Sequence, residues 1–236
     1  MGFLSFVNEN RTLNESIHDK GLFKAVFLTG VPGAGKSYVL SKIKSGSIEP
    51  RIVNIDKITE YLDIEHIEKV YDRAKQLSKN QLVQYLNGVL PLFIDTTAAN
   101  PQRLKIRVNT LERIGYDCAM IFVNTSLETS LKRASQRQRV VPPQVIEDYY
   151  KKIQKLKDDM KGLFSFHMEI NNNEGELTDD VILKAYKRIS YFYDADIDNP
   201  IGNERYSQML DNKWSYLSPN IMSLDEIKNI TNQWYS

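Results

Sequence analysis

The sequence contains little cysteine and little histidine. Its single cysteine, Cys118, rules out an intramolecular disulfide, and its place before an apolar run predicts a small core residue. The three histidines, His18, His66 and His167, are scattered without the spacing of metal ligands. Neither a disulfide-stapled fold nor a zinc site is therefore expected.

Long apolar runs and a strong net charge are also missing. No apolar run approaches the roughly 18 residues that a membrane-spanning helix needs. Residues 1–6 lack the basic start and the small-residue cleavage site of a secretory signal. The net charge of +1 gives the whole chain no general attraction for nucleic acid or acidic lipid. These absences predict a cytoplasmic protein without a membrane partner.

Short apolar runs alternate with longer stretches of helical spacing. The runs that are typical of buried strands are residues 25–29, 52–55, 90–94, 119–123 and 164–170. The stretches that favour helices are residues 35–43, 64–86 (as one helix or two), 101–114, 127–136 and 143–161. This alternation predicts an α/β fold with a five-stranded parallel sheet and helices on both faces.

The chain divides into three expected parts. Residues 1–21 form an N-terminal arm, residues 22–176 form the α/β domain, and residues 177–236 form a helical C-terminal extension packed on that domain. Within the extension, residues 194–202 are acidic and turn-like, and residues 224–234 predict a last helix.

A glycine-rich motif follows the first expected strand and opens the first expected helix. It reads Gly30, Val31, Pro32, Gly33, Ala34, Gly35, Lys36 and Ser37, and Tyr38 follows it. Glycines in this pattern let backbone N–H groups point at phosphate oxygens, and the helix adds its N-terminal dipole. We expect this segment, Tyr38 included, to bind ATP or GTP. Lys36 would reach the β- and γ-phosphates, and the Ser37 hydroxyl would coordinate Mg²⁺.

Two carboxylates come at or near the ends of expected strands. Asp56 could accept a proton from a substrate hydroxyl, or it could be the N-cap of a following helix. Asp95 could hold Mg²⁺ together with Ser37, or it could cap the helix that Pro101 opens, although Asn100 is better placed for that.

Three arginines lie near the end of the expected helix 127–136. Arg133 and Arg137 are four residues apart and share one helical face, and Arg139 follows. Guanidinium groups suit phosphate oxygens, so these residues could close over the phosphates. Positive charge at a solvated helix C-terminus is the alternative interpretation.

Together these segments resemble the P-loop kinases that include the 5′-kinase domain of phage polynucleotide kinase and the zeta-toxin kinases. The resemblance rests on the phosphate loop, Asp56, the segment from Asp95 to Pro101, and the arginines at 133, 137 and 139, and it covers roughly residues 22–171. It implies a P-loop kinase fold, ATP and Mg²⁺ as cofactors, and catalytic roles for Lys36, Asp56, Arg137 and Arg139. Many relatives have an arginine three residues after the activating acid, where this chain has Thr59.

The acceptor that we expect is a polynucleotide 5′-hydroxyl or a nucleotide, from the resemblance and from the charge of the middle region. Residues 101–165 contain 13 Lys and Arg against 7 Asp and Glu, whereas residues 166–236 contain 6 against 12. A nucleotide-sugar hydroxyl is the second possibility. A P-loop ATPase or binding module without an acceptor is the third. The pattern does not predict an oligomeric state.

The C-terminal stretch, with Asn199-Pro200-Ile201-Gly202, resembles the tails of kinases from large tailed phages. Leu13-Asn14-Glu15 is similar to a phage head-protease cleavage site. If the protein is viral, the expected compartment is the host cytoplasm, and packaging in the virion is the alternative.

Overall fold

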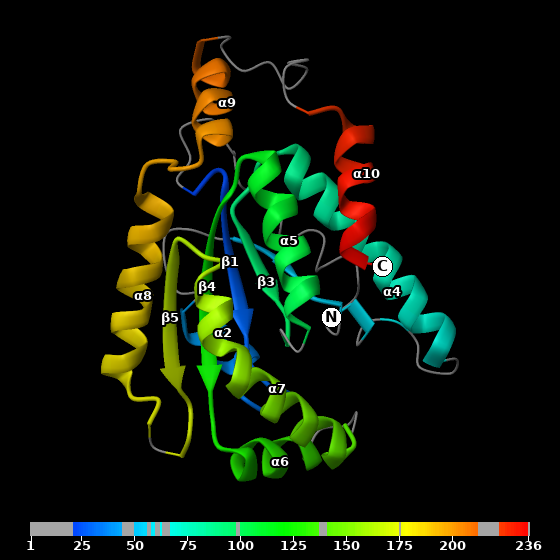
Figure 1. Cartoon of the computed structure of the whole chain (residues 1–236), viewed down its shortest axis with the longest axis vertical. Helices are drawn as coiled ribbons and strands as arrows, with labels where there is room; N and C mark the ends of the chain where they lie inside the picture. Colours follow the sequence, from blue (N-terminus) through cyan, green and yellow to red (C-terminus); the bar gives the residue numbers. More distant parts are fainter. Residues whose placement is uncertain are drawn as a thin grey trace.

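The computed structural model describes residues 21–43, 50–55, 58–59, 62, 67–97, 100–136, 141–174, 176–211 and 222–235. In this part of the chain, five strands form one sheet in the order β2-β3-β1-β4-β5, and every neighbouring pair is parallel (Figure 1). The strands are β1 (Lys24–Thr29), β2 (Arg51–Val53), β3 (Leu92–Asp95), β4 (Asp117–Asn124) and β5 (Phe166–Asn171). The expected five-stranded parallel sheet is confirmed.

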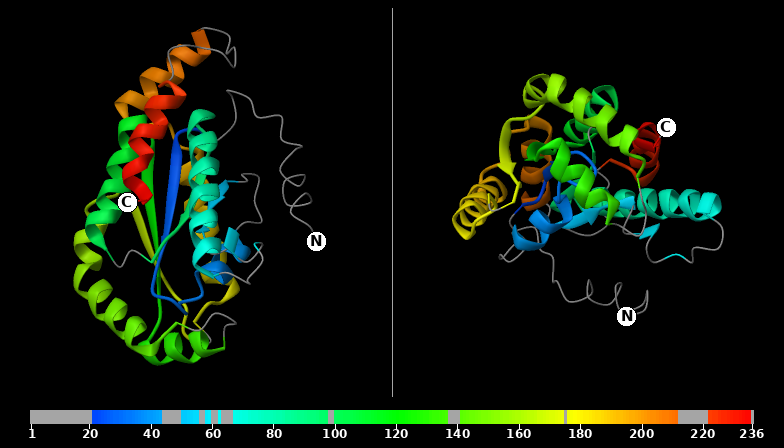
Figure 2. Two further views of the ribbon diagram at one scale, coloured as in Figure 1. Left: turned by 90° about the vertical axis from the view of Figure 1, so that its right-hand side faces the viewer. Right: turned by 90° about the horizontal axis from the view of Figure 1, so that it is seen from below.

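Helices cover both faces of this sheet. They are α2 (Lys36–Ile43), α4 (Ile67–Asn87), α5 (Pro101–Ile114), α6 (Leu127–Ser135), α7 (Pro143–Lys161), α8 (Asp179–Asp194), α9 (Pro200–Asp211) and α10 (Leu224–Tyr235). Figure 2 shows α5, α7 and α10 on one face and α2, α4 and α8 on the other. Because both faces are covered, every residue of the central strand β1 is buried, which explains its continuous apolar run.

Local signals set the ends of α5 where the sequence predicts them. The side chain of Asn100 accepts a hydrogen bond from the backbone N–H of Arg103, and Pro101 occupies the first turn. Gly115 ends the helix with φ 108°, in the left-handed region.

The structure decides one open alternative along the chain and corrects one expectation. Of the alternatives left open for the stretch 64–86, one helix or two, the structure has one helix, α4, over residues 67–87. The segment 194–202 is not turn-like throughout, because helix α9 begins at Pro200. The Asn199 side chain accepts hydrogen bonds from the N–H groups of Ile201 and Gly202, at 3.0 and 3.2 Å, which starts the helix.

The C-terminal helices pack on the α/β body rather than standing apart from it. Helix α8 contacts β5 and α2, α9 contacts α5, and α10 lies against α4 and α5. The tail aromatics Phe192, Tyr193 and Trp234 are buried. The division into three domains remains a prediction. Among the helices of the described residues, none is long and apolar enough to cross a membrane.

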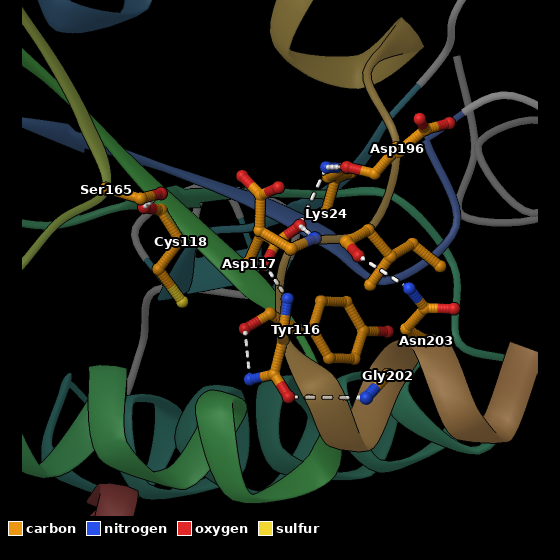
Figure 3. A network of polar contacts seen from close by, with 11 residues as sticks. Lys24, Tyr116, Asp117, Cys118, Ser165, Asp196, Gly202 and Asn203 are labelled. Atoms are coloured by element: carbon orange, nitrogen blue, oxygen red, sulfur yellow. Dashed lines mark hydrogen bonds and ion pairs between the residues drawn. The ribbon is translucent and has the colours of Figure 1, made fainter.

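A buried ion pair ties the α8–α9 connection to the edge of the sheet where β1 and β4 begin (Figure 3). Lys24 Nζ lies 2.7 Å from Asp117 Oδ2 and donates to the Asp196 carbonyl at 2.6 Å. The Asp117 carboxylate also accepts from the backbone N–H groups of Asp198 and Asn199, at 2.9 and 2.8 Å. The carboxylate therefore joins β1, β4 and the C-terminal segment.

Cys118 is the small core residue that its position predicts, since only 3% of it is exposed. Burial raises the pKa of its thiol well above the usual value, and the nearby carboxylates of Glu112 and Asp117 add to the increase. A thiol held in its neutral form is a poor nucleophile, so Cys118 has no place in the candidate chemistry.

Candidate functional site

The loop between β1 and α2 has the strand–loop–helix placement that the motif requires. Its glycines have positive φ angles of 148° at Gly30, 87° at Gly33 and 83° at Gly35. A Cβ atom at Gly33 would lie 2.2 Å from the carbonyl oxygen of Ser130, and one at Gly35 would lie 2.3 Å from Nδ2 of Asn172. The backbone therefore curls closely against α6 and the end of β5, where no side chain fits. The other residues before Lys36 are buried: Val31, Pro32 and Ala34.

Alanine at position 33 is expected to weaken ATP binding by at least about tenfold, because the new methyl group would meet the Ser130 backbone and the left-handed φ would be strained. Titration with a fluorescent ATP analogue would measure the effect. Gly162→Ala is the matched control, since its φ is −65° and the nearest atom to the new Cβ lies 3.6 Å away. Equal affinity in both variants would contradict the close backbone packing around Gly30, Gly33 and Gly35, which we call the glycine cradle.

Lys36, Ser37 and Tyr38 form the first turn of α2. The ammonium group of Lys36 donates to the carbonyl oxygens of Gly30 and Val31, at 3.0 and 3.4 Å, so the cation lies over the start of the loop. Ser37 is exposed, and Tyr38 is 51% exposed. The Lys36 cation and the Ser37 hydroxyl thus lie beside the glycine cradle.

Asp95 is the last residue of β3 and pairs in register with Leu28 of β1. The N–H of Thr96 donates to the Leu28 carbonyl at 3.0 Å, which continues the pairing as far as the start of the phosphate loop. The Asn54 amide, directly after β2, donates to Asp95 Oδ2 at 2.7 Å. The carboxylate therefore lies at the same edge of the sheet as the loop, and Asn54 fixes its orientation. Because Asn100 caps α5, the alternative capping role for Asp95 is excluded.

Arg133 of α6 reaches the phosphate loop through Asn172. Its Nη1 donates to the Asn172 carbonyl at 2.7 Å, and the Asn172 side-chain amide donates to the Ala34 carbonyl at 2.7 Å. Nη1 would lie 3.7 Å from a Cβ atom on Gly35. The guanidinium therefore lies at the phosphate loop. The alternative interpretation, an arginine that only adds positive charge to a solvated helix end, does not describe Arg133.

Three other predicted residues, Asp56, Arg137 and Arg139, lie outside the described residues. Their roles as hydroxyl-activating acid and phosphate-closing arginines stay predictions. Thr59, in the place of the arginine of many relatives, donates its hydroxyl to the Ile55 carbonyl at 2.9 Å.

Sequence reasoning missed two asparagines. Asn54 and Asn172 are both buried, with 8% and 4% exposed, and each follows a strand directly. A polar side chain directly after an apolar strand was the available signal for both. The sequence could not show that Asn54 bonds to Asp95 or that Asn172 bonds to Ala34, since the partners are distant in the sequence.

The described residues fit a triphosphate and a divalent metal ion. The glycine cradle has no room for side chains, and a lysine ammonium lies over it. The Ser37 hydroxyl and the Asp95 carboxylate are hard oxygen donors of the kind that Mg²⁺ prefers.

The AAA domain family matches residues 26–156, which is more than half of the chain, so the chain belongs to this family. The family match, the sheet order and the phosphate loop between β1 and α2 agree on a kinase-type P-loop fold, as the sequence resemblance implied. The expected fold class is thereby confirmed.

Several solved structures are similar to this chain at low sequence identity. A structure of the PezAT chromosomal toxin–antitoxin system of Streptococcus pneumoniae has a TM-score of 0.50 and 16% identity, over 89% of this chain and 93% of that chain. A structure of the Pnkp1/Rnl/Hen1 RNA repair complex has a TM-score of 0.49 and 20% identity, over 64% of this chain and 48% of that chain. Deoxyadenosine kinase from M. mycoides has a TM-score of 0.44 and 14% identity, over 70% of this chain and 98% of that chain.

Proposed function

We propose that this chain is an ATP- and Mg²⁺-dependent kinase that transfers the γ-phosphate to a hydroxyl group. The observation that carries the proposal is the meeting of three groups at one edge of the sheet. They are the glycine cradle after β1, the Asp95 carboxylate at the end of β3 and the Arg133 guanidinium beside the loop. A cradle alone would serve any triphosphate-binding protein. The adjacent carboxylate and arginine supply the metal ligand and the positive charge that phosphoryl transfer needs.

The donor half of the reaction is assigned to the loop and its neighbours. Lys36 and the loop backbone hold the β- and γ-phosphates. Mg²⁺, held by Ser37 and Asp95, would neutralise negative charge on those phosphates. Arg133, with Arg137 and Arg139, closes over the phosphates and stabilises the charge of the moving phosphoryl group.

The acceptor half is assigned to Asp56, which takes the proton of the acceptor hydroxyl. The hydroxyl oxygen then bonds to the γ-phosphorus. The bond between that phosphorus and the bridging oxygen of the β-phosphate breaks, and ADP leaves. Lys36 stabilises the negative charge that develops on the leaving oxygen.

A polynucleotide 5′-hydroxyl or a nucleotide is the preferred acceptor. The sequence excess of Lys and Arg between residues 101 and 165 supports this choice. This stretch includes α6 and α7, which Figure 1 shows at the edge where the strands end. Positive charge beside the site attracts an acceptor that has phosphate groups.

A panel of acceptors incubated with γ-³²P-ATP tests the proposal. We expect label on 5′-hydroxyl DNA or RNA, or on a nucleotide, and none when Mg²⁺ is chelated. Label on a nucleotide sugar alone would instead support a zeta-toxin-like kinase. Equal ATP hydrolysis with and without every acceptor would support an ATPase and contradict the kinase assignment.

Asp56→Asn is expected to lower the transfer rate by about 10²–10⁴-fold, because the amide cannot take the proton from the hydroxyl. ATP binding should change little, since the loop and Asp95 are intact. Asp148→Asn, at an exposed position of α7, is the matched control and should keep the wild-type rate. Transfer at the wild-type rate by the Asp56 variant would refute the assignment of the base.

A further inference from the structure

The C-terminal helix α10 inserts a tryptophan beneath the candidate site. Its buried face consists of Ile227, Thr231 and Trp234, of which 0%, 0% and 3% are exposed. The Trp234 ring stacks on Phe27 of β1, with centroids 6.3 Å apart. Phe27 pairs in register with Ile94, the residue before Asp95. The indole therefore lies one residue below the edge of the sheet at which Asp95 and the phosphate loop lie.

The same indole also contacts Arg107 of α5. The guanidinium carbon of Arg107 is 5.4 Å from the Trp234 ring centroid, within the range of a cation–π contact. Arg107 Nη1 donates to the hydroxyl oxygen of Thr96 at 3.2 Å. A continuous series of contacts thus runs from Phe27 through Trp234 and Arg107 to Thr96.

Thr96 is held from two sides. Its hydroxyl accepts from Arg107, and its backbone N–H donates to the carbonyl of Leu28 on β1. Since Thr96 follows Asp95 directly, these two bonds hold the backbone from which the carboxylate projects. Asn54 holds the carboxylate itself at 2.7 Å. Hydrogen bonds that involve Asn54, β1 and α5 thus all contribute to the position of Asp95.

Arg107 is half-buried between α5 and α10. Burying a guanidinium has a desolvation cost, whereas a leucine or methionine at the same place would have no charge to desolvate. What the guanidinium adds is a rigid planar fork that donates in a fixed direction once its plane is set. The guanidinium carbon lies over the Trp234 ring at 5.4 Å, so the indole restricts the orientations open to this fork.

We propose that Arg107 and Trp234 are positioning residues of the phosphotransfer site. The indole holds the guanidinium, the guanidinium holds Thr96, and Thr96 holds Asp95 where the metal ion binds. Helix α10 therefore contributes to the geometry of the site through Trp234. The inference rests on the proposed function, because it takes Asp95 as a Mg²⁺ ligand.

The test measures the Mg²⁺ concentration that gives half-maximal ATP binding, and half-maximal transfer where an acceptor is labelled. Arg107→Met and Trp234→Leu should each raise this concentration by about tenfold, because loss of a residue that supports a metal ligand typically costs 10–100-fold in metal affinity or activity. Trp234→Phe keeps an aromatic face and should recover most of the wild-type value. Arg113→Met, an exposed arginine at the other end of α5, should have no effect.

A purely structural role gives a different result. In that case Arg107→Met and Trp234→Leu would lower the melting temperature but leave the half-maximal Mg²⁺ concentration unchanged, which would overturn the inference. A wild-type protein that binds Mg²⁺-ATP but labels no acceptor would refute the proposed function alone, since the binding titration still tests Arg107 and Trp234. Absence of Mg²⁺-dependent ATP binding in the wild type would overturn both.

Intrinsic fluorescence adds a second readout. The chain has two tryptophans, and Trp214→Phe leaves Trp234 as the only one. We expect Mg²⁺-ATP to change the emission of Trp234 in this background, and the change to disappear when Arg107→Met is added although ATP still binds. An unchanged fluorescence response in the Arg107 variant would show that the indole does not report on the site through Arg107, against the inference.

Discussion

Methionine in place of Lys36 is expected to reduce phosphotransfer at least about 100-fold, the usual cost of removing one group that stabilises transition-state charge. The Lys36 ammonium lies 3.0 Å from the Gly30 carbonyl and 3.4 Å from the Val31 carbonyl, over the start of the glycine cradle. Methionine keeps most of the side-chain volume but has no charge. The melting temperature should therefore change little, whereas the initial rate with γ-³²P-ATP should fall steeply.

Lys184→Met is the control for this experiment. Lys184 lies on α8, and its side chain is 73% exposed, paired with Asp180. Its loss should leave the rate at the wild-type value, since exposed ion pairs contribute little. Equal rates for the Lys36 and Lys184 variants would show that the loop lysine has no part in the transfer.

Asp117→Asn is expected to lower the free energy of unfolding by about 3–5 kcal/mol, the usual cost of breaking a buried ion pair from one side. The substitution leaves the Lys24 ammonium, 2% exposed, without a counter-charge. It also weakens the acceptors for the N–H groups of Asp198 and Asn199. Urea denaturation followed by circular dichroism would measure the loss, with the midpoint expected to fall and the slope to stay similar.

Asp158→Asn makes the same chemical change in an exposed pair. Asp158 Oδ1 lies 2.9 Å from Lys161 Nζ, but 80% of the aspartate side chain is exposed. We expect almost no change in the free energy of unfolding there, because solvent screens an exposed pair. Similar losses in the two variants would mean that the Lys24–Asp117 pair does not hold the C-terminal segment to the sheet.

Much of the fold was predictable because its signals are local. The buried strands have continuous apolar runs in the sequence, because helices cover both faces of the sheet. Helix α5 could be bounded to the residue because Asn100, Pro101 and Gly115 act within one turn of its ends. Helix α9 was missed although Asn199 and Pro200 are a typical start. The aspartates that precede Asn199 and the glycine in the first turn of the helix favour a turn over a helix in the sequence.

The glycine at position 202 has a reason that only the tertiary structure supplies. A Cβ atom there would lie 2.0 Å from the Gly115 carbonyl oxygen, so α9 can approach the end of α5 only without a side chain. The residue that weakens the helix locally is the one that permits its packing. No pattern within residues 194–202 contains that information.

The sequence by itself determined the parallel sheet and the phosphate loop, because strand burial and glycine conformation act over a few neighbouring residues. It also singled out Asp95 and Arg133 as candidates. Only the tertiary structure decided their partners. Asn54 meets Asp95, and Asn172 links Arg133 to Ala34. It likewise decided that the Arg107 guanidinium lies over the Trp234 ring. These contacts join residues that are distant in the sequence, and they form only when the strands and helices pack.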